Sequence, residues 1–306
     1  MTSTSRYFWG ALVCLLVLPA RLALAQELEP RRWSHLPTGS SFAAAGYSHV
    51  DANIQFNPAL QIENATEDAH ILGFGYIRVF DVFGKTGRIQ MQLNHSNARW
   101  EGLLEGDPAS TERHGFNDPS VRFAVNLVGS PAQRGAAFRE FKVTTIVGAA
   151  LEIKAPLGEY KQDKLINLGT NRWTIKPELG AVHYWGKWSA EVTTSIWFFT
   201  DNDDFGGDAK REQAPLYAVQ GHLIHTFRPG LWVSLSGAYG DGARSKIDGV
   251  KVDDRTQKSL FALSLGLPIS PRQGVKIAYV RGDTHADTGD NYDQLLIVYS
   301  RMWGGQ

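Results

Sequence analysis

The chain has 306 residues, with 31 Lys and Arg against 31 Asp and Glu, so its formal net charge is zero. This balance argues against a strongly basic nucleic-acid-binding surface, and we expect no nucleic-acid partner. The single cysteine, Cys14, excludes a disulfide framework and any metal site built from several cysteines. Apolar residues make up 43% of the chain, yet the mean hydropathy is −0.24, so apolar and polar residues must be interleaved.

Residues 1–25 have the features of a secretory signal peptide. Arg6 gives a positive start, the apolar run 8–18 is too short to span a bilayer, and the small residues of 23–25 resemble a cleavage site. We therefore expect export and a mature chain that begins at Gln26. The only cysteine would be removed with the signal, which suits an oxidising compartment.

The rest of the sequence is dominated by an alternation with a period of two. Apolar residues occupy most odd positions from Val143 to Ile153, while Glu152 and Lys154 occupy even ones. Such alternation over eight or more residues indicates β-strands. The predicted strands are 43–56, 69–82, 87–102, 117–128, 141–155, 171–185, 188–200, 214–227, 231–240, 257–268, 273–282 and 292–303.

Short and long connections alternate along the chain. The short ones are 85–86, 186–187, 228–230 and 269–273, and the long polar ones are 57–68, 103–116, 156–170, 201–213, 241–256 and 283–291. Short turns on one side and long loops on the other are typical of a membrane barrel with both termini on the short-turn side. A soluble sandwich has no reason to sort its loops in this way. By this alternation the connection 129–140 should be one of the short turns, but it is longer than the others.

Tryptophans are placed where membrane interfaces would lie. Trp173 and Trp185 share one face of a predicted strand, and ~40 Å of strand tilted by ~45° rises roughly 28 Å, close to the thickness of a bilayer core. Trp188 opens the next strand on the same rim as Trp185, and Trp232 and Trp303 lie near short turns. We predict that these five side chains form interface girdles. The alternative is that they are core residues of a soluble β-sandwich.

A sheet that spans a membrane must close on itself, because lipid cannot satisfy its backbone hydrogen bonds. We therefore predict an all-β fold, a transmembrane antiparallel up-and-down β-barrel of about 12 strands over residues 43–306. Its partners would be outer-membrane lipid, lipopolysaccharide and a barrel-assembly machinery. Residues 26–42 lack a strand pattern, and we expect a periplasmic segment or a plug that enters the lumen.

Several motifs with their order and spacing resemble a known family. They are Gly-Phe-Asn-Asp-Pro at 115–119, Ala-Pro-Leu-Gly-Glu-Tyr at 155–160, Asn-Leu-Gly-Thr-Asn-Arg-Trp at 167–173, Gln-Ala-Pro-Leu at 213–216 and Arg-Pro-Gly-Leu-Trp at 228–232. From Gly115 to Trp303 the chain resembles the outer-membrane family named for the meta-pathway of phenol degradation, whose members are described as transporters. The resemblance implies a barrel that passes hydrophobic or aromatic compounds, and it supplies no catalytic residues.

Alternation assigns side chains to the lipid and to the lumen. Predicted lipid-facing residues are Ile89, Leu93, Val147, Leu151, Leu263 and Leu265. Charged residues on the lumen face are the candidates for a solute path, since they would select which charges and dipoles pass. They are Arg88, Arg122, Glu152, Lys154, Arg172, Lys176, Glu178 and Glu191. They could instead be paired charges that merely fill the lumen.

Other chemistry has little support in the sequence. The tract Asp201–Asp208 partly follows a calcium loop, but Phe205 occupies a position that needs an oxygen ligand, so a solvated outer loop is favoured, with cations bridging it to lipopolysaccharide. His222 faces the lumen but has no serine two residues before or after it on its strand, so no nucleophile and base can be paired there. We expect no enzymatic activity, no metal and no cofactor. The predicted function is a channel for small hydrophobic or aromatic solutes. The alternative is a non-conducting structural or adhesive barrel that acts through its outer loops.

Overall fold

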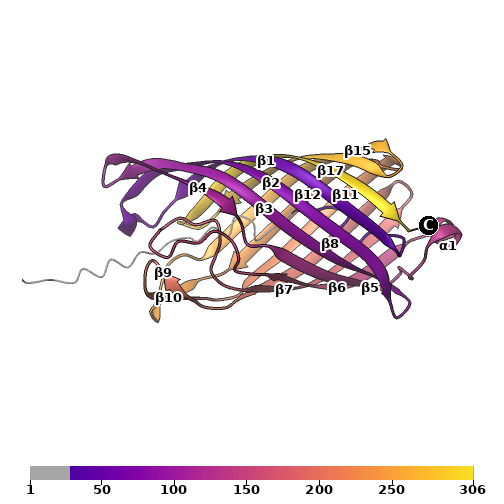
Figure 1. Cartoon of the computed structure of the whole chain (residues 1–306), viewed down its shortest axis with the longest axis horizontal. Helices are drawn as coiled ribbons and strands as arrows, with labels where there is room; N and C mark the ends of the chain where they lie inside the picture. The colour runs from indigo at the N-terminus through magenta and orange to yellow at the C-terminus, as the bar shows by residue number, and fades with distance from the viewer. Residues whose placement is uncertain (1–27, 306) are drawn as a thin grey trace, which may run out of the picture.

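The computed structural model describes residues 28–305, and it folds them into a closed cylinder of antiparallel strands (Figure 1). Twelve strands form the wall in chain order, and β1 closes it by pairing with both β2 and β17. The wall strands are β1 (Ser40–Gln55), β2 (Ile62–Val82), β3 (Lys85–Leu104), β5 (Ser120–Val128), β6 (Thr145–Lys154), β7 (Thr174–Trp185), β8 (Trp188–Phe199), β11 (Leu216–Arg228), β12 (Leu231–Gly242), β15 (Thr256–Ser270), β16 (Gln273–Thr284) and β17 (Gly289–Gly304). The predicted all-β barrel is confirmed, and the sandwich is excluded. The predicted signal peptide, 1–25, lies outside the described residues.

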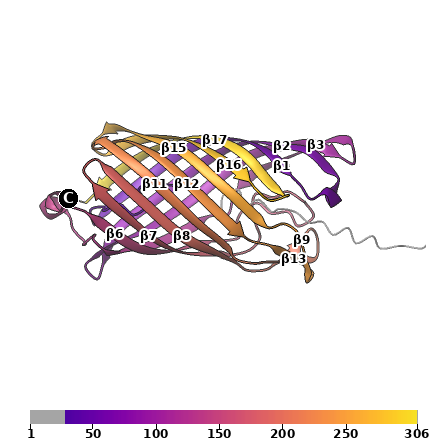
Figure 2. The same cartoon turned by 180° about the vertical axis from the view of Figure 1, so that it is seen from behind.

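The two ends of the cylinder differ, as the alternation of connections predicted. The C-terminus and the short helix α1 (Gly135–Glu140) lie at the end with short turns, and α1 accounts for the long connection there. The opposite end carries a small second sheet (Figures 1 and 2). Its strands are β9 (Asn202–Phe205), β10 (Ala209–Gln213), β13 (Ser245–Ile247) and β14 (Val250–Lys251). A short 3₁₀ helix, η1 (Pro58–Leu60), follows β1.

Three connections expected to be loops contain strands. Segment 103–116 forms β4 (Asp107–Phe116), which pairs with the outer half of β3, and segments 201–213 and 241–256 supply the small sheet. β4 carries few apolar residues, and the strands of the small sheet have only two to five residues each, too few to show an alternation although Phe205 and Ile247 are buried in them. The turn expected at 85–86 is also misplaced. It lies at Phe83 and Gly84, which both have positive φ, as a two-residue hairpin turn requires.

The wall separates apolar from polar side chains. All six residues predicted to face lipid lie on the outward side, and Leu151, for example, is 41% exposed. Neighbouring positions in the sequence face inward and are largely polar and buried, including Arg88, Asn126 and Thr193. An exterior of this kind needs a lipid solvent, and fold and exterior are those of an outer-membrane barrel. No helix in the described part of the chain is long and apolar enough to cross a membrane.

Pro177 lies inside β7, where a proline has no N–H to donate to the neighbouring strand. β7 continues through Pro177, whose side chain faces outward. The pairing of β7 with β8 skips Lys176 and Pro177 and then resumes in the same register. The proline therefore removes a hydrogen bond without bending the strand out of the wall.

Two substitutions on β6 test which face meets the lipid. Leu151→Arg should cost ~2–4 kcal/mol of folding free energy, because the guanidinium would enter the bilayer midplane. Lys154→Leu changes an inward side chain and should cost less. Urea unfolding of both variants in lipid vesicles measures the difference, and equal costs would show the face assignment to be wrong.

Candidate functional site: the barrel lumen

Residues 28–39 precede β1, and their side chains contact the inward face of the wall. Trp33 is fully buried, and its indole Nε1 donates a 2.8 Å hydrogen bond to Thr193 Oγ1 on β8. Gly148 and Gly180, which are paired in register on β6 and β7, lie against the ring. A Cβ at either glycine would overlap the indole, so the two glycines form a flat socket for Trp33.

Arg32 joins a buried ionic cluster in the lumen. Its guanidinium Nη2 lies 3.0 Å from Glu152 Oε2 and 3.6 Å from Glu178 Oε1. Lys176 Nζ contacts the same two carboxylates at 2.9 and 3.3 Å. Arg122 Nε donates to Glu178 Oε2 at 2.7 Å, and its guanidinium lies over the Trp33 ring. Each charge faces an opposite one, which is the condition for keeping charges buried.

Further contacts hold the same segment along the lumen. The backbone N–H of Arg32 donates to Glu191 Oε1 at 3.0 Å. Toward the short-turn end, His35 Nδ1 lies 2.7 Å from Ser130 Oγ, and its ring stacks on Phe138 of α1. Burial lowers the pKa of His35, which favours the neutral ring in this position. The segment is thus fixed both at the middle of the lumen and at its short-turn end.

The structure corrects the position of one predicted girdle residue. Trp232 faces the lumen, where the guanidinium of Arg31 lies 5.6 Å from the ring centroid and Gly266 provides the space beside it. Its exposed strand neighbour is Val233, so the ring has the parity of the inward face. The other four predicted girdle residues are 42–48% exposed on the exterior. They are Trp173, Trp185, Trp188 and Trp303.

The predicted lumen residues divide into two groups. Arg88, Arg122, Glu152, Lys176, Glu178 and Glu191 lie on the inward face around residues 28–39. Lys154 and Arg172 lie nearer the long-loop end, where they line a separate cavity. Arg172 hydrogen-bonds Gln213, and its guanidinium lies over the Phe199 ring. That these residues form a solute path stays a prediction.

The cavity occupies the part of the lumen toward the long loops and has a volume of about 160 Å³. Its wall is largely apolar, with four aromatic rings from β3, β8 and β17, which are Trp100, Trp197, Phe199 and Tyr292. Asn94, Lys154 and Arg172 provide polar groups among them. Beside Arg32 and Trp197 the lumen holds a separate gap of only about 10 Å³.

The family-like motifs come together around Asp118 at the mouth of this cavity. The Asp118 carboxylate accepts hydrogen bonds from the Gly158 N–H at 2.9 Å, the Thr170 N–H at 2.8 Å and the Thr170 hydroxyl at 2.6 Å. A Cβ at Gly158 would overlap Asp118, and a Cβ at Gly169 would overlap the Gly158 backbone, so neither position tolerates a side chain without movement. Asp118 is part of one of the family-like motifs, but the motif alone does not predict that this carboxylate organises loop 155–173.

The small sheet adds a second cover over the cavity. Arg211 is buried and donates to Ser245 Oγ and to Asp254 Oδ2. Burial lowers the pKa of Arg211, and the Asp254 carboxylate opposes that shift. The loops are also joined to each other, because the Tyr160 hydroxyl donates to the Asp204 carbonyl oxygen at 2.9 Å.

Two other sequence candidates have different surroundings from those expected. In the acidic tract, Lys210 Nζ lies 2.6 Å from Asp201 and 3.9 Å from Asp203, inside the β9–β10 hairpin rather than a calcium loop. His222 Nδ1 lies 2.8 Å from Ser236 Oγ on β12. The ring's Nε2 has no hydrogen-bond partner within residues 28–305, so no carboxylate orients the ring as in a Ser–His–acid triad.

Comparison with known proteins agrees with the fold. An outer membrane channel from Pseudomonas putida F1 superimposes with a TM-score of 0.75 at 20% identity, covering 90% of this chain and 100% of that chain. The transport unit of the autotransporter AIDA-I from Escherichia coli gives 0.53 at 8% identity, with 92% and 94% covered. No curated protein sequence matches this chain. The family model described as "Putative MetA-pathway of phenol degradation" matches residues 39–291, and the chain therefore belongs to that family.

Proposed function

We propose that this protein is an outer-membrane channel for small hydrophobic or single-ring aromatic compounds. The observation that supports the proposal most directly is the lumen cavity, at about 160 Å³. A protein cavity of roughly 150 Å³ with apolar walls takes up benzene. A single aromatic ring therefore matches the cavity in size, and the Trp and Phe side chains of its wall match it in polarity.

We propose in addition that residues 28–39 act as a plug between the cavity and the short-turn end. Arg32 and Trp33 lie across the middle of the lumen, where their contacts with the wall are ionic, aromatic and hydrogen-bonded. A solute in the cavity would pass further only after this segment moves. The inward charges around Arg32 would then line the path.

The function is tested by filling the cavity. Ala98 is buried on the inward face of β3 and lines the cavity. Ala98→Phe should reduce uptake of labelled toluene by cells that carry the protein in an intact outer membrane. The matched control is Ala45→Phe on β1, which places the same ring on the exposed exterior. It should leave uptake unchanged.

The same assay separates a channel from a purely structural or adhesive barrel. Cells with the wild-type protein should take up toluene faster than cells without it. Uptake of a four-ring compound such as pyrene should be equal in the two kinds of cell. If toluene uptake is the same with and without the protein, the channel proposal fails.

A further inference from the structure

The exterior of β1 and β2 changes from apolar to polar over three successive rungs of the sheet. The rungs run across β17, β1, β2 and β3 and consist of outward side chains that are neighbours in register. From the lipid band toward the long-loop end they are Ile297, Tyr47, Leu72 and His95, then Leu295, His49, His70 and Asn97, then Asp293, Asp51, Asp68 and Arg99. The middle and outer rungs therefore lie at the outer edge of the apolar band.

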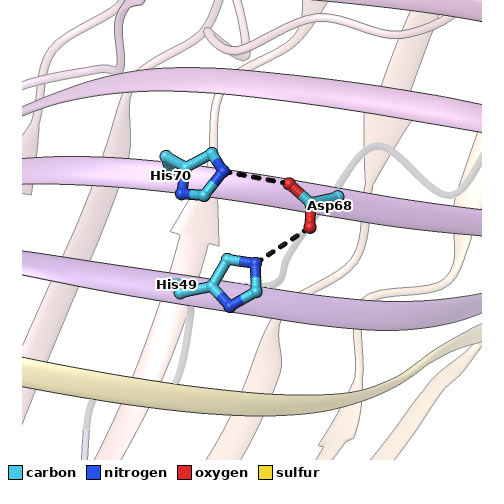
Figure 3. A group of neighbouring side chains, drawn as sticks. All are labelled: His49, Asp68 and His70. Carbon is cyan, nitrogen blue, oxygen red and sulfur yellow. Dashed lines mark hydrogen bonds and ion pairs between the residues drawn. The ribbon is translucent and has the colours of Figure 1, made fainter.

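Three side chains on these rungs converge on one point. His49 and His70 are direct cross-strand partners, and their rings stack with centroids 4.8 Å apart. Asp68 lies beyond them on β2, with Oδ2 2.9 Å from His49 Nε2 and Oδ1 3.2 Å from His70 Nε2 (Figure 3). Ligand atoms of the three residues all lie within 4.8 Å of one another.

The second nitrogen of each ring also has a neighbour that can accept its proton. His70 Nδ1 lies 2.6 Å from the Tyr47 hydroxyl, and His49 Nδ1 lies 3.6 Å from Asp51 Oδ2. Histidines that bind a metal through one nitrogen usually donate the other N–H to an oxygen, which fixes the tautomer and the ring direction. Tyr47 thus supplies this supporting contact for His70, and the Asp51 carboxylate would supply it for His49 after moving a few tenths of an ångström closer.

The separations suit a transition-metal ion better than an alkaline-earth ion. In a tetrahedron with bonds of ~2.1 Å, ligand atoms lie ~3.4 Å apart. The two nitrogen–oxygen contacts, which end on different Asp68 oxygens, are 2.9 and 3.2 Å long, and a carboxylate that turns one oxygen between the rings needs a small movement. Two imidazoles and one carboxylate are a set that zinc binds, whereas calcium and magnesium prefer oxygen ligands alone.

We propose that His49, Asp68 and His70 bind one divalent transition-metal ion, with Zn²⁺ as the best match, on the outer surface of the barrel. The two Nε2 atoms and one Asp68 oxygen would be the protein ligands, and a fourth position would stay open to water. The site is on the exterior and shares no residue with the lumen, so it does not depend on the proposed channel function.

The test is a Zn²⁺ titration of the full-length, untagged protein in detergent, with a chromophoric chelator as competitor. The wild type should bind one equivalent of Zn²⁺. His49→Ala, His70→Ala and Asp68→Asn should each weaken binding by at least tenfold. Tyr47→Phe should weaken it by roughly 10- to 100-fold, the usual effect of removing a partner of a metal-bound histidine.

The control is His114→Ala on β4, an exposed outward histidine that pairs in register with Asn97. It should bind Zn²⁺ as the wild type does, and all variants should retain the heat-modifiable gel migration of folded barrels. Co²⁺ added to the wild type should give visible absorption bands of histidine ligation that are lost in His70→Ala. No Zn²⁺ binding by the wild type at millimolar concentration, or equal affinities of His49→Ala, His70→Ala and wild type, would overturn the proposal.

Discussion

Deleting residues 28–36 should raise the ion conductance of the protein in planar bilayers several-fold over the wild type. The deletion removes Arg32 and Trp33, which contact the wall across the middle of the lumen. It leaves all twelve wall strands and the backbone contact of Thr38 with Gln133 in place. The measurement is single-channel conductance of the two proteins, purified and reconstituted in the same way.

A smaller change gives the matched comparison for this deletion. Trp33→Ala removes the indole from its glycine socket but keeps the Arg32 ion pairs, so its conductance should fall between those of the wild type and the deletion. Wild-type conductance in a folded deletion variant would contradict the assignment of residues 28–39 as a plug.

Replacing Glu178 with Gln should be the most destabilising single substitution in the lumen, at about 3–5 kcal/mol of unfolding free energy. Its carboxylate contacts three cations, Arg32, Arg122 and Lys176, and its side chain is 1% exposed. Without the negative charge Arg122 loses this carboxylate contact, while Arg32 and Lys176 keep their contacts with Glu152. Urea unfolding in lipid vesicles measures the loss.

The double variant separates the role of the segment from that of the wall. In protein lacking residues 28–36, Arg32 is absent, so Glu178→Gln should cost less than in the full-length chain. Lys154→Gln, for which no ion pair is found in the described structure, should cost little in either background. An equal cost of Glu178→Gln with and without residues 28–36 would show that Arg32 does not depend on this carboxylate.

The sequence predicted the wall well because a wall strand has only two environments. Lipid on one side and a polar lumen on the other impose the alternation. The side of the wall on which Leu151 or Glu152 lies can therefore be predicted from the sequence alone. The same logic failed where a strand leaves the lipid. β4 carries few apolar residues and the strands of the small sheet are only two to five residues long, so nothing in their period distinguishes them from loops.

The lumen was harder to predict because its contacts join distant parts of the chain. Trp33 meets glycines and a threonine more than a hundred residues away, and residues 28–39 have no period of their own. The signal that could have been used is the pair Gly148 and Gly180, two inward glycines in strands that otherwise carry larger side chains. Trp232 lies near a turn, as a girdle residue would, but its parity on β12 assigns it to the lumen, and parity is the better guide.

The unequal strand lengths give the cylinder a slanted outer edge. β2 and β3 have 21 and 20 residues, against 10 in β6 and 12 in β7. At ~3.3 Å per residue and a tilt of ~45°, ten additional residues raise that side by roughly 23 Å. The highest part of the molecule above the membrane is therefore hydrogen-bonded sheet. An antibody or a phage that approaches the cell would meet there a stiff ribbon closed by tight connections, in place of a flexible loop.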